Sequence, residues 1–275
     1  MKRIIATTIS IVSLSSSALA LFISSPAMAG DSWTGFYTGI NAGYGTGEYT
    51  NSSSYFQPGH TEYYDNYISA VYPTVFGSGK SQSFVNGGVA GGQVGYNKQF
   101  ANNIVIGIEG DMNWSNVFDR GQYSNSSGYQ FTTSRFGDAS MVGNNYSKTG
   151  LDWFGTVRGK FGYAFGNFMP YFTAGLAFGQ ISDVSNSTFN YGSYGAVGGG
   201  SASKTSAGWA MGAGAEYKLN DNWSVKGEYL YTNFNGPSSS SFAENGGRKS
   251  FSSSKITDFG VNHVRAGINY HFNLF

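Results

Sequence analysis

The chain has 275 residues, of which 11% are charged and 17% are aromatic, and its formal net charge is +1. This balance argues against nucleic-acid binding, which needs a basic surface, and the sequence has no cysteine for disulfides or thiolate chemistry. The 41 glycines would suit a disordered chain, but disordered chains are poor in aromatic residues, and this one has 22 Phe and 20 Tyr. The composition favours an ordered, β-rich protein.

The first 29 residues follow the order of a secretory signal peptide. Lys2 and Arg3 precede a largely apolar run, and Ala27-Met28-Ala29 ends it with an A-x-A pattern. An uncleaved anchor helix fits less well, because serines interrupt the run. We therefore expect cleavage after Ala29, which leaves residues 30–275 with 14 basic residues (16 less Lys2 and Arg3) against 15 acidic ones.

Eight later segments alternate apolar and polar residues with a period of two, as half-buried strands do. No stretch after residue 29 reaches the ~18 consecutive apolar residues that a transmembrane helix needs. In chain order the segments are Phe36 to Gly45, Gly88 to Asn97, Ile104 to Trp114, Leu151 to Phe165, Pro170 to Gln180, Ala207 to Lys218, Trp223 to Thr232 and Val261 to Phe272.

The connections between these segments alternate between long and short. Four are long, polar and rich in Gly, Ser and Asn, namely 46–87, 115–150, 181–206 and 233–260, and three are short, namely Asn97–Asn103, Gly166–Met169 and Leu219–Asn222. Outer-membrane barrels have an even strand number, short periplasmic turns and long external loops. The sequence therefore predicts an all-β protein, an eight-stranded antiparallel transmembrane β-barrel with four long external loops and three short periplasmic turns.

Four of the segments also resemble a known family. Residues 33–45, 208–217, 222–231 and 264–272 are similar to the small outer-membrane β-barrel porin family, which is related to the OmpA transmembrane domain and includes surface antigens and hemin-binding proteins of Gram-negative bacteria. The resemblance implies a place in the outer membrane, contact with its lipid, and insertion by the barrel-assembly machinery. Family members usually end on an aromatic residue in phase with the lipid face. Phe272 is in phase, but Asn273-Leu274-Phe275 follow it in this sequence, and Phe275 is out of phase.

The charged residues of the expected strands fall on the face opposite to the apolar one. They are Glu109, Asp111, Asp152, Arg158, Lys160, Glu216, Lys226, Glu228 and Arg265. Such groups are costly against lipid, so we expect them to line the barrel interior as a network of ion pairs. An eight-stranded barrel is just wide enough for side chains to fill it, which favours a structural network over a charged, solute-selecting pore.

The remaining residues bear on two chemical functions, hemin binding and catalysis. Tyr and His can ligate haem iron, so His60, Tyr63 and Tyr64 in the first long connection are hemin candidates, although their spacing is not diagnostic. No G-x-S-x-G, H-E-x-x-H or Walker sequence is present. We therefore expect no enzymatic activity, no catalytic residue and no metal site.

The expected function is a structural, surface-exposed role in the bacterial cell envelope, with loops that contact host or environmental ligands. Two alternatives stay open, a narrow porin for small solutes and a hemin-binding surface protein.

Overall fold

A computed structural model describes residues 33–58, 60–64, 67–72, 75–119, 122–133, 137–191, 194–236, 238–245 and 248–272. The predicted signal peptide, residues 1–29, lies outside these ranges and stays a prediction. Within them, the chain has no helix long and apolar enough to cross a membrane.

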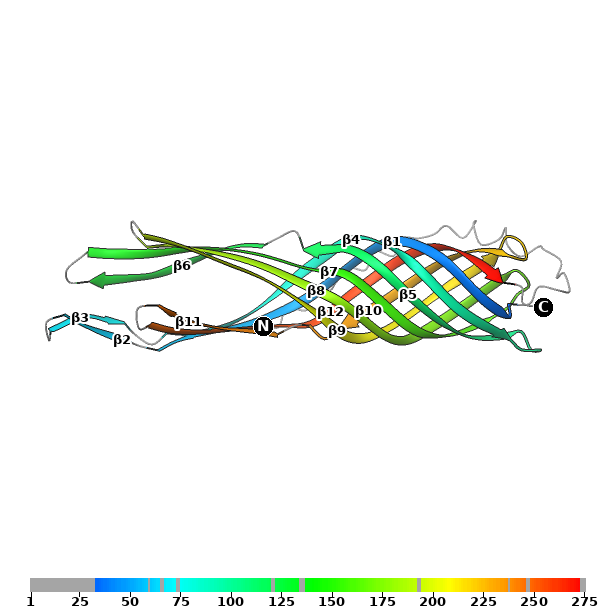
Figure 1. Ribbon diagram of the computed structural model, residues 1–275, viewed down its shortest axis with the longest axis horizontal. Coiled ribbons are helices and arrows are strands. Elements are labelled where there is room, and N and C mark those ends of the chain that lie inside the picture. Colours follow the sequence, from blue (N-terminus) through cyan, green and yellow to red (C-terminus); the bar gives the residue numbers. More distant parts are fainter. Residues whose placement is uncertain are drawn as a thin grey trace, which may run out of the picture.

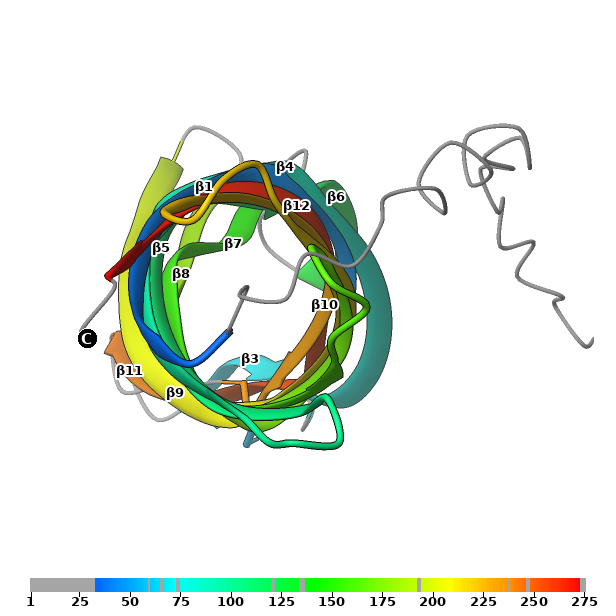
Figure 2. The same cartoon turned by 90° about the vertical axis from the view of Figure 1, so that its right-hand side faces the viewer.

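Eight antiparallel strands close into a barrel, as the sequence predicts (Figures 1 and 2). Neighbouring strands follow the order β1-β4-β5-β7-β8-β9-β10-β12, and pairing of β12 with β1 closes the ring. The strands are β1 (Gly35–Gln57), β4 (Val75–Gln99), β5 (Ile104–Asp119), β7 (Gly137–Tyr163), β8 (Phe168–Tyr191), β9 (Tyr194–Lys218), β10 (Trp223–Phe234) and β12 (Arg248–Phe272).

The side chains of each barrel strand alternate between the outer wall and the interior. On β1, Ile40 is 69% exposed whereas Asn41 is 5% exposed. The same alternation holds along the eight predicted segments except at Asp152, because successive side chains of a strand point to opposite faces. The apolar residues of the sequence pattern therefore lie outside, and the polar ones lie inside.

The three short turns join β4 to β5, β7 to β8, and β9 to β10 at one end of the barrel (Figure 1). Asn103 and Gly166, one in each of the first two turns, have positive φ angles of 63° and 62°. Asn and Gly tolerate this left-handed conformation better than other residues do. By analogy with known outer-membrane barrels, this end is the periplasmic one.

An apolar band surrounds the outer wall between two belts of aromatic side chains. The belt nearer the turns includes Phe36, Tyr96, Tyr163, Trp223 and Phe272, and the other includes Tyr44, Trp114, Trp153, Trp209 and Tyr231. From Phe36 to Tyr44 the strand rises by about 26 Å at ~3.3 Å per residue. With the usual strand tilt of about 35–45°, the band is about 20 Å tall, close to that of bacterial barrels.

The described residues of the long connections are mostly β-strands. Strands β1 and β4 stay paired without interruption from Gly35↔Asn97 to Gln57↔Val75, well beyond the predicted strand ends. Further strands β2 (His60–Tyr64), β3 (Tyr67–Tyr72), β6 (Gln122–Thr133) and β11 (Ser238–Asn245) lie in the same connections. These Ser-, Asn- and Gly-rich sequences lack a period of two, because outside the bilayer neither face has to be apolar.

The barrel wall divides into two β-sheet ribbons at its outer end. Strand β5 ends at Asp119, so its neighbours β4 and β7 continue without that strand between them. Strand β10 ends at Phe234, and its neighbours β9 and β12 likewise continue without it. One ribbon has the order β4-β1-β12-β11, and the other has the order β6-β7-β8-β9. Figure 1 shows the ribbons extending from the end of the barrel opposite to the short turns.

Candidate functional site: the filled barrel interior

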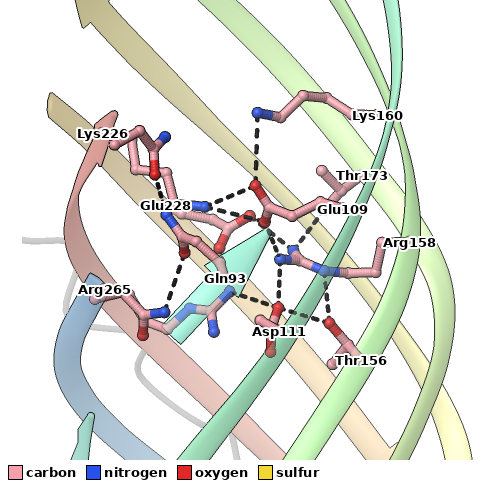
Figure 3. A network of polar contacts seen from close by, with 12 residues as sticks. Gln93, Glu109, Asp111, Thr156, Arg158, Lys160, Thr173, Lys226, Glu228 and Arg265 are labelled. Atoms are coloured by element: carbon pink, nitrogen blue, oxygen red, sulfur yellow. Dashed lines mark hydrogen bonds and ion pairs between the residues drawn. The ribbon is translucent and has the colours of Figure 1, made fainter. Parts of the chain in front are cut away.

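A layer of eight charged side chains crosses the middle of the barrel (Figure 3). Four acidic and four basic residues contribute to it, so their formal charges cancel. They come from five strands and are buried, namely Glu109, Asp111, Arg158, Lys160, Glu216, Lys226, Glu228 and Arg265. We call these residues the charge layer.

Arg158 lies at the centre of the charge layer. Its Nη2 donates to Glu109 Oε1 at 2.6 Å and to Asp111 Oδ2 at 2.8 Å, and its Nη1 donates to Glu228 Oε1 at 2.7 Å. Nη1 also reaches Thr173 Oγ1, and Nε reaches Thr156 Oγ1, both at 2.9 Å. One guanidinium group therefore joins carboxylates from β5 and β10, which are not neighbours in the sheet.

Glu109 joins this centre to the two lysines. Lys226 Nζ lies 3.0 Å from both of its carboxylate oxygens, and Lys160 Nζ lies 3.7 Å from Oε2. Arg265 completes the layer by pairing with Glu228 and, at 3.5 Å, with Asp111. Because each buried charge has an opposite charge beside it, the layer avoids the large desolvation cost of an isolated buried ion.

Glu216 is the acceptor nearer to the periplasmic end. Lys160 Nζ is 3.2 Å from Oε2, and Oε1 accepts hydrogen bonds from Ser224 Oγ at 2.6 Å and Asn269 Nδ2 at 2.7 Å. His271 Nε2 lies 2.8 Å from Ser224 Oγ and 3.2 Å from Glu216 Oε1. A hydrolase triad needs the carboxylate on the other ring nitrogen, Nδ1, so this Ser-His-Glu group does not have catalytic geometry.

Apolar side chains close the interior on both sides of the charge layer. The upper apolar layer, on the ribbon side, consists of Tyr49, Val85, Val89, Val117, Leu151, Phe154, Ala177, Ile181, Ala210, Leu230, Phe234, Ile256, Phe259 and Val261. The floor, on the turn side, consists of Trp33, Val105, Ala164, Met169 and Tyr171. The interior is therefore a packed core in three layers.

Trp33 fixes the floor from just before β1. Its indole Nε1 donates to the Gly166 carbonyl oxygen at 3.0 Å, its backbone N donates to Gln99 Oε1 at 2.8 Å, and Lys218 Nζ lies 5.0 Å from the ring centroid. The side chain is 1% exposed. No strand pattern marks this residue, since it precedes the strand, and only the closed barrel brings it under the interior.

Asp152 does not join the charge layer, although sequence alternation placed it there. Leu151 pairs with Ile181 and Trp153 pairs with Gln180, which leaves Asp152 as the extra residue of a β-bulge. A bulge shifts the alternation by one residue, so Asp152 accepts hydrogen bonds from Ser182 Oγ and Gln180 Nε2 on the outer side of the wall. The sequence carries no clear signal for this shift.

The hemin candidates lie on β2, where His60 pairs with Tyr72 and Tyr64 pairs with Tyr67 in the hairpin with β3. The side chains of His60, Tyr63 and Tyr64 lie outside the described part of the structure. Hemin binding by these residues stays a prediction. A Soret shift that is lost on replacing His60 would support it, and an unchanged spectrum on titration would contradict it.

Two tyrosines reach the charge layer across glycines of neighbouring strands. Tyr37 pairs with Gly95 and donates its hydroxyl to Glu109 Oε2 at 2.8 Å, and Tyr171 pairs with Gly214. A Cβ atom at Gly95 would lie 2.4 Å from the Tyr37 ring and hydroxyl. Glycine is therefore required at this position for the ring to lie flat across the strand.

The change Gly95→Ala is expected to lower the free energy of unfolding by about 1–3 kcal/mol, through overpacking and loss of the Tyr37 hydrogen bond to Glu109. Urea titration of the refolded barrel would measure it. Gly92→Ala on the same strand is the matched control, because its added Cβ would have no atom nearer than 3.7 Å. Equal effects at Gly92 and Gly95 would contradict this account of Tyr37.

Comparison with known proteins identifies the family. Residues 15–272 match the family described as outer membrane protein beta-barrel domain. The chain is 37% identical over 242 residues to the 31 kDa outer-membrane immunogenic protein of Brucella melitensis, which covers 88% of this chain and 84% of that protein. It is 34% identical over 146 residues to the 22 kDa outer membrane protein of Rhizobium leguminosarum, covering 52% of each.

Among solved structures, the outer membrane protein OprG of Pseudomonas aeruginosa is 14% identical and gives a TM-score of 0.36, with 87% of this chain and 97% of that chain covered. The family match spans all eight barrel strands, and the Brucella and Rhizobium relatives are outer-membrane proteins by name. The chain therefore belongs to the outer membrane β-barrel domain family and is an outer-membrane protein of the cell envelope.

Proposed function

We propose that this protein is a closed outer-membrane anchor that presents two β-sheet ribbons outside the cell, and that it does not conduct solutes. The observation that carries the proposal is the three-layered interior, in which a paired charge layer lies between two apolar layers. A selective pore would need charged groups that face water, but Arg158, Glu109 and Glu228 have side chains with no exposed area.

The two ribbons support a role at the cell surface. They continue the barrel wall for many residues, with pairing between β8 and β9 reaching Tyr191↔Tyr194. The Brucella relative is called an immunogenic protein, which is consistent with a surface that antibodies meet. We infer that the ribbons carry the contacts with host or environmental ligands. The aromatic Phe272 on the outer wall supports insertion by the barrel-assembly machinery.

Planar-bilayer recording of refolded residues 30–275 tests the absence of conduction. A gel shift between boiled and unboiled samples first establishes folding, and a known porin reconstituted in parallel shows that the bilayer reports channels. We expect no discrete openings, since buried apolar side chains lie on both sides of the paired charge layer. Stable openings from the folded barrel would contradict the proposal and favour the narrow porin.

Surface presentation has a separate test in whole cells. Protease added outside the cells is expected to cut within the ribbons and leave a protected fragment of the barrel. Failure to cut intact cells, with cutting after the outer membrane is opened, would show that the ribbons do not face outward.

A further inference from the structure

Two apolar grooves lie on the outer wall of the barrel, and both are lined in part by β5 and β7. The larger has a volume of about 810 Å³ and is lined by Ile106, Phe161, Phe172, Ala174, Ala213 and Tyr231, among others. The smaller has a volume of about 430 Å³ and is lined by Tyr96, Ile108, Gly110 and Val157, among others. Both face the hydrocarbon of the membrane in which the protein lies.

The larger groove arises from small outward-facing residues between large ones. Gly159 pairs with Ala174 on the neighbouring strand, and Phe172 pairs with Ala213. Phe161 lies on the periplasmic side of this hollow and Tyr231 on the opposite side. The larger groove therefore forms where small side chains lie beside large ones, and it crosses several strands.

The direction of the larger groove fits a lipid chain. It begins at Ile106, two residues from the periplasmic end of β5, and passes Ala213 of β9 before it reaches Tyr231 in the other aromatic belt. The part from Ile106 to Ala213 crosses three inter-strand steps of ~4.8 Å, or about 14 Å. Half of a ~30 Å hydrocarbon core is about 15 Å, so an obliquely placed acyl chain of one leaflet matches this part of the groove.

A single cation lies beside the periplasmic end of the larger groove. Lys98 is exposed on the outer face near the end of β4, and it pairs with Ile106 of the larger groove. The next outward residue on β4 is Tyr96, which lines the smaller groove. Among the described strand residues from the periplasmic rim to the middle of the outer wall, Lys98 is the only charged side chain that faces outward.

We propose that the outer wall retains one phospholipid of the periplasmic leaflet, with its phosphate at Lys98 and its two acyl chains in the two grooves that meet at β5. A lysine at a bilayer interface extends its ammonium group to headgroup level, where it meets lipid phosphate. Two grooves and one cation match the two chains and one phosphate of such a lipid. A second protein copy would not account for a lone lysine at the rim.

Native mass spectrometry of the full barrel released from nanodiscs of phosphatidylglycerol and phosphatidylcholine tests the site. We expect one retained lipid on the wild-type protein, enriched in phosphatidylglycerol. Ala213→Phe and Ala174→Phe each fill the larger groove and are expected to remove the retained lipid. The matched control is Ala266→Phe, which faces lipid at a similar depth on β12 but lies in neither groove, and it is expected to keep the lipid.

Lys98→Gln is expected to lower the retained phosphatidylglycerol about two- to fivefold, as suits an exposed ion pair. In the wild-type protein, a photoreactive phosphatidylglycerol should label Ala174 and Ala213 more than Val264 and Ala266, which lie in neither groove, and this checks the site without any substitution. Equal retention by Ala213→Phe and wild type, loss of lipid from Ala266→Phe, or even labelling around the barrel would overturn the proposal. So would a protein dimer without retained lipid, which would mean that a second copy covers the grooves.

Discussion

Replacement of Arg158 by methionine is expected to lower the free energy of unfolding by about 3–5 kcal/mol, the usual cost of removing one partner from a buried ion pair. Arg158 contacts Glu109, Asp111 and Glu228 and has no exposed side-chain area. Methionine keeps much of the volume but leaves four carboxylates with three cations in a space closed to water. Urea titration of the refolded barrel, followed by the gel shift, would measure the change.

Two further variants separate charge balance from packing. Arg158→Met combined with Asp111→Asn restores three acidic and three basic groups, and it should recover part of the lost stability. Lys80→Met removes an exposed cation on the β4 ribbon and should change stability little. If Arg158→Met unfolded at the same urea concentration as Lys80→Met, the charge layer would not hold the strands together.

Ile40→Arg is expected to cost about 2–4 kcal/mol and to impair assembly, which is the typical effect of arginine near the midplane on the lipid face of a barrel. Ile40 is 69% exposed and lies midway between the aromatic Phe36 and Tyr44 on β1. The guanidinium would therefore be placed in hydrocarbon, far from either interface. The fraction of protein that gains the folded gel mobility in lipid vesicles would report the effect.

The control for Ile40→Arg is Ser78→Arg, at an exposed position of the β4 ribbon beyond the apolar band. Water surrounds this position, so the added charge should cost little. Equal tolerance of arginine at positions 40 and 78 would contradict the assignment of the outer wall to lipid.

The barrel wall could be predicted almost completely from the sequence. Alternation of period two places Ile40 outside and Asn41 inside, and apart from Asp152 it assigns the faces of the other predicted segments in the same way. The turns around Asn103 and Gly166 were also predictable, because each is a short segment between two segments that alternate with a period of two. A bilayer favours apolar side chains on the outer face, and this is why the local pattern predicts the wall so well.

Three features depended on contacts that no local pattern records. Asp152 leaves the interior because a bulge shifts the register of β7 against β8. The ribbons remain paired beyond the bilayer although Ser, Asn and Gly show no alternation there. Trp33 becomes the floor because the closed barrel brings the Gly166 carbonyl next to it. Each depends on pairing between strands far apart in the chain.

The sequence by itself determined the class of fold, the strand faces and the sign of each interior charge, since side-chain direction along a strand follows residue number. Only the tertiary structure decided which charges meet. Arg158 on β7 reaches Glu228 on β10 across the barrel, and the larger groove appears only when β5, β7, β8, β9 and β10 lie side by side. Closure of the sheet sets these neighbours, because barrel radius and strand register fix distances that residue spacing along one strand does not contain.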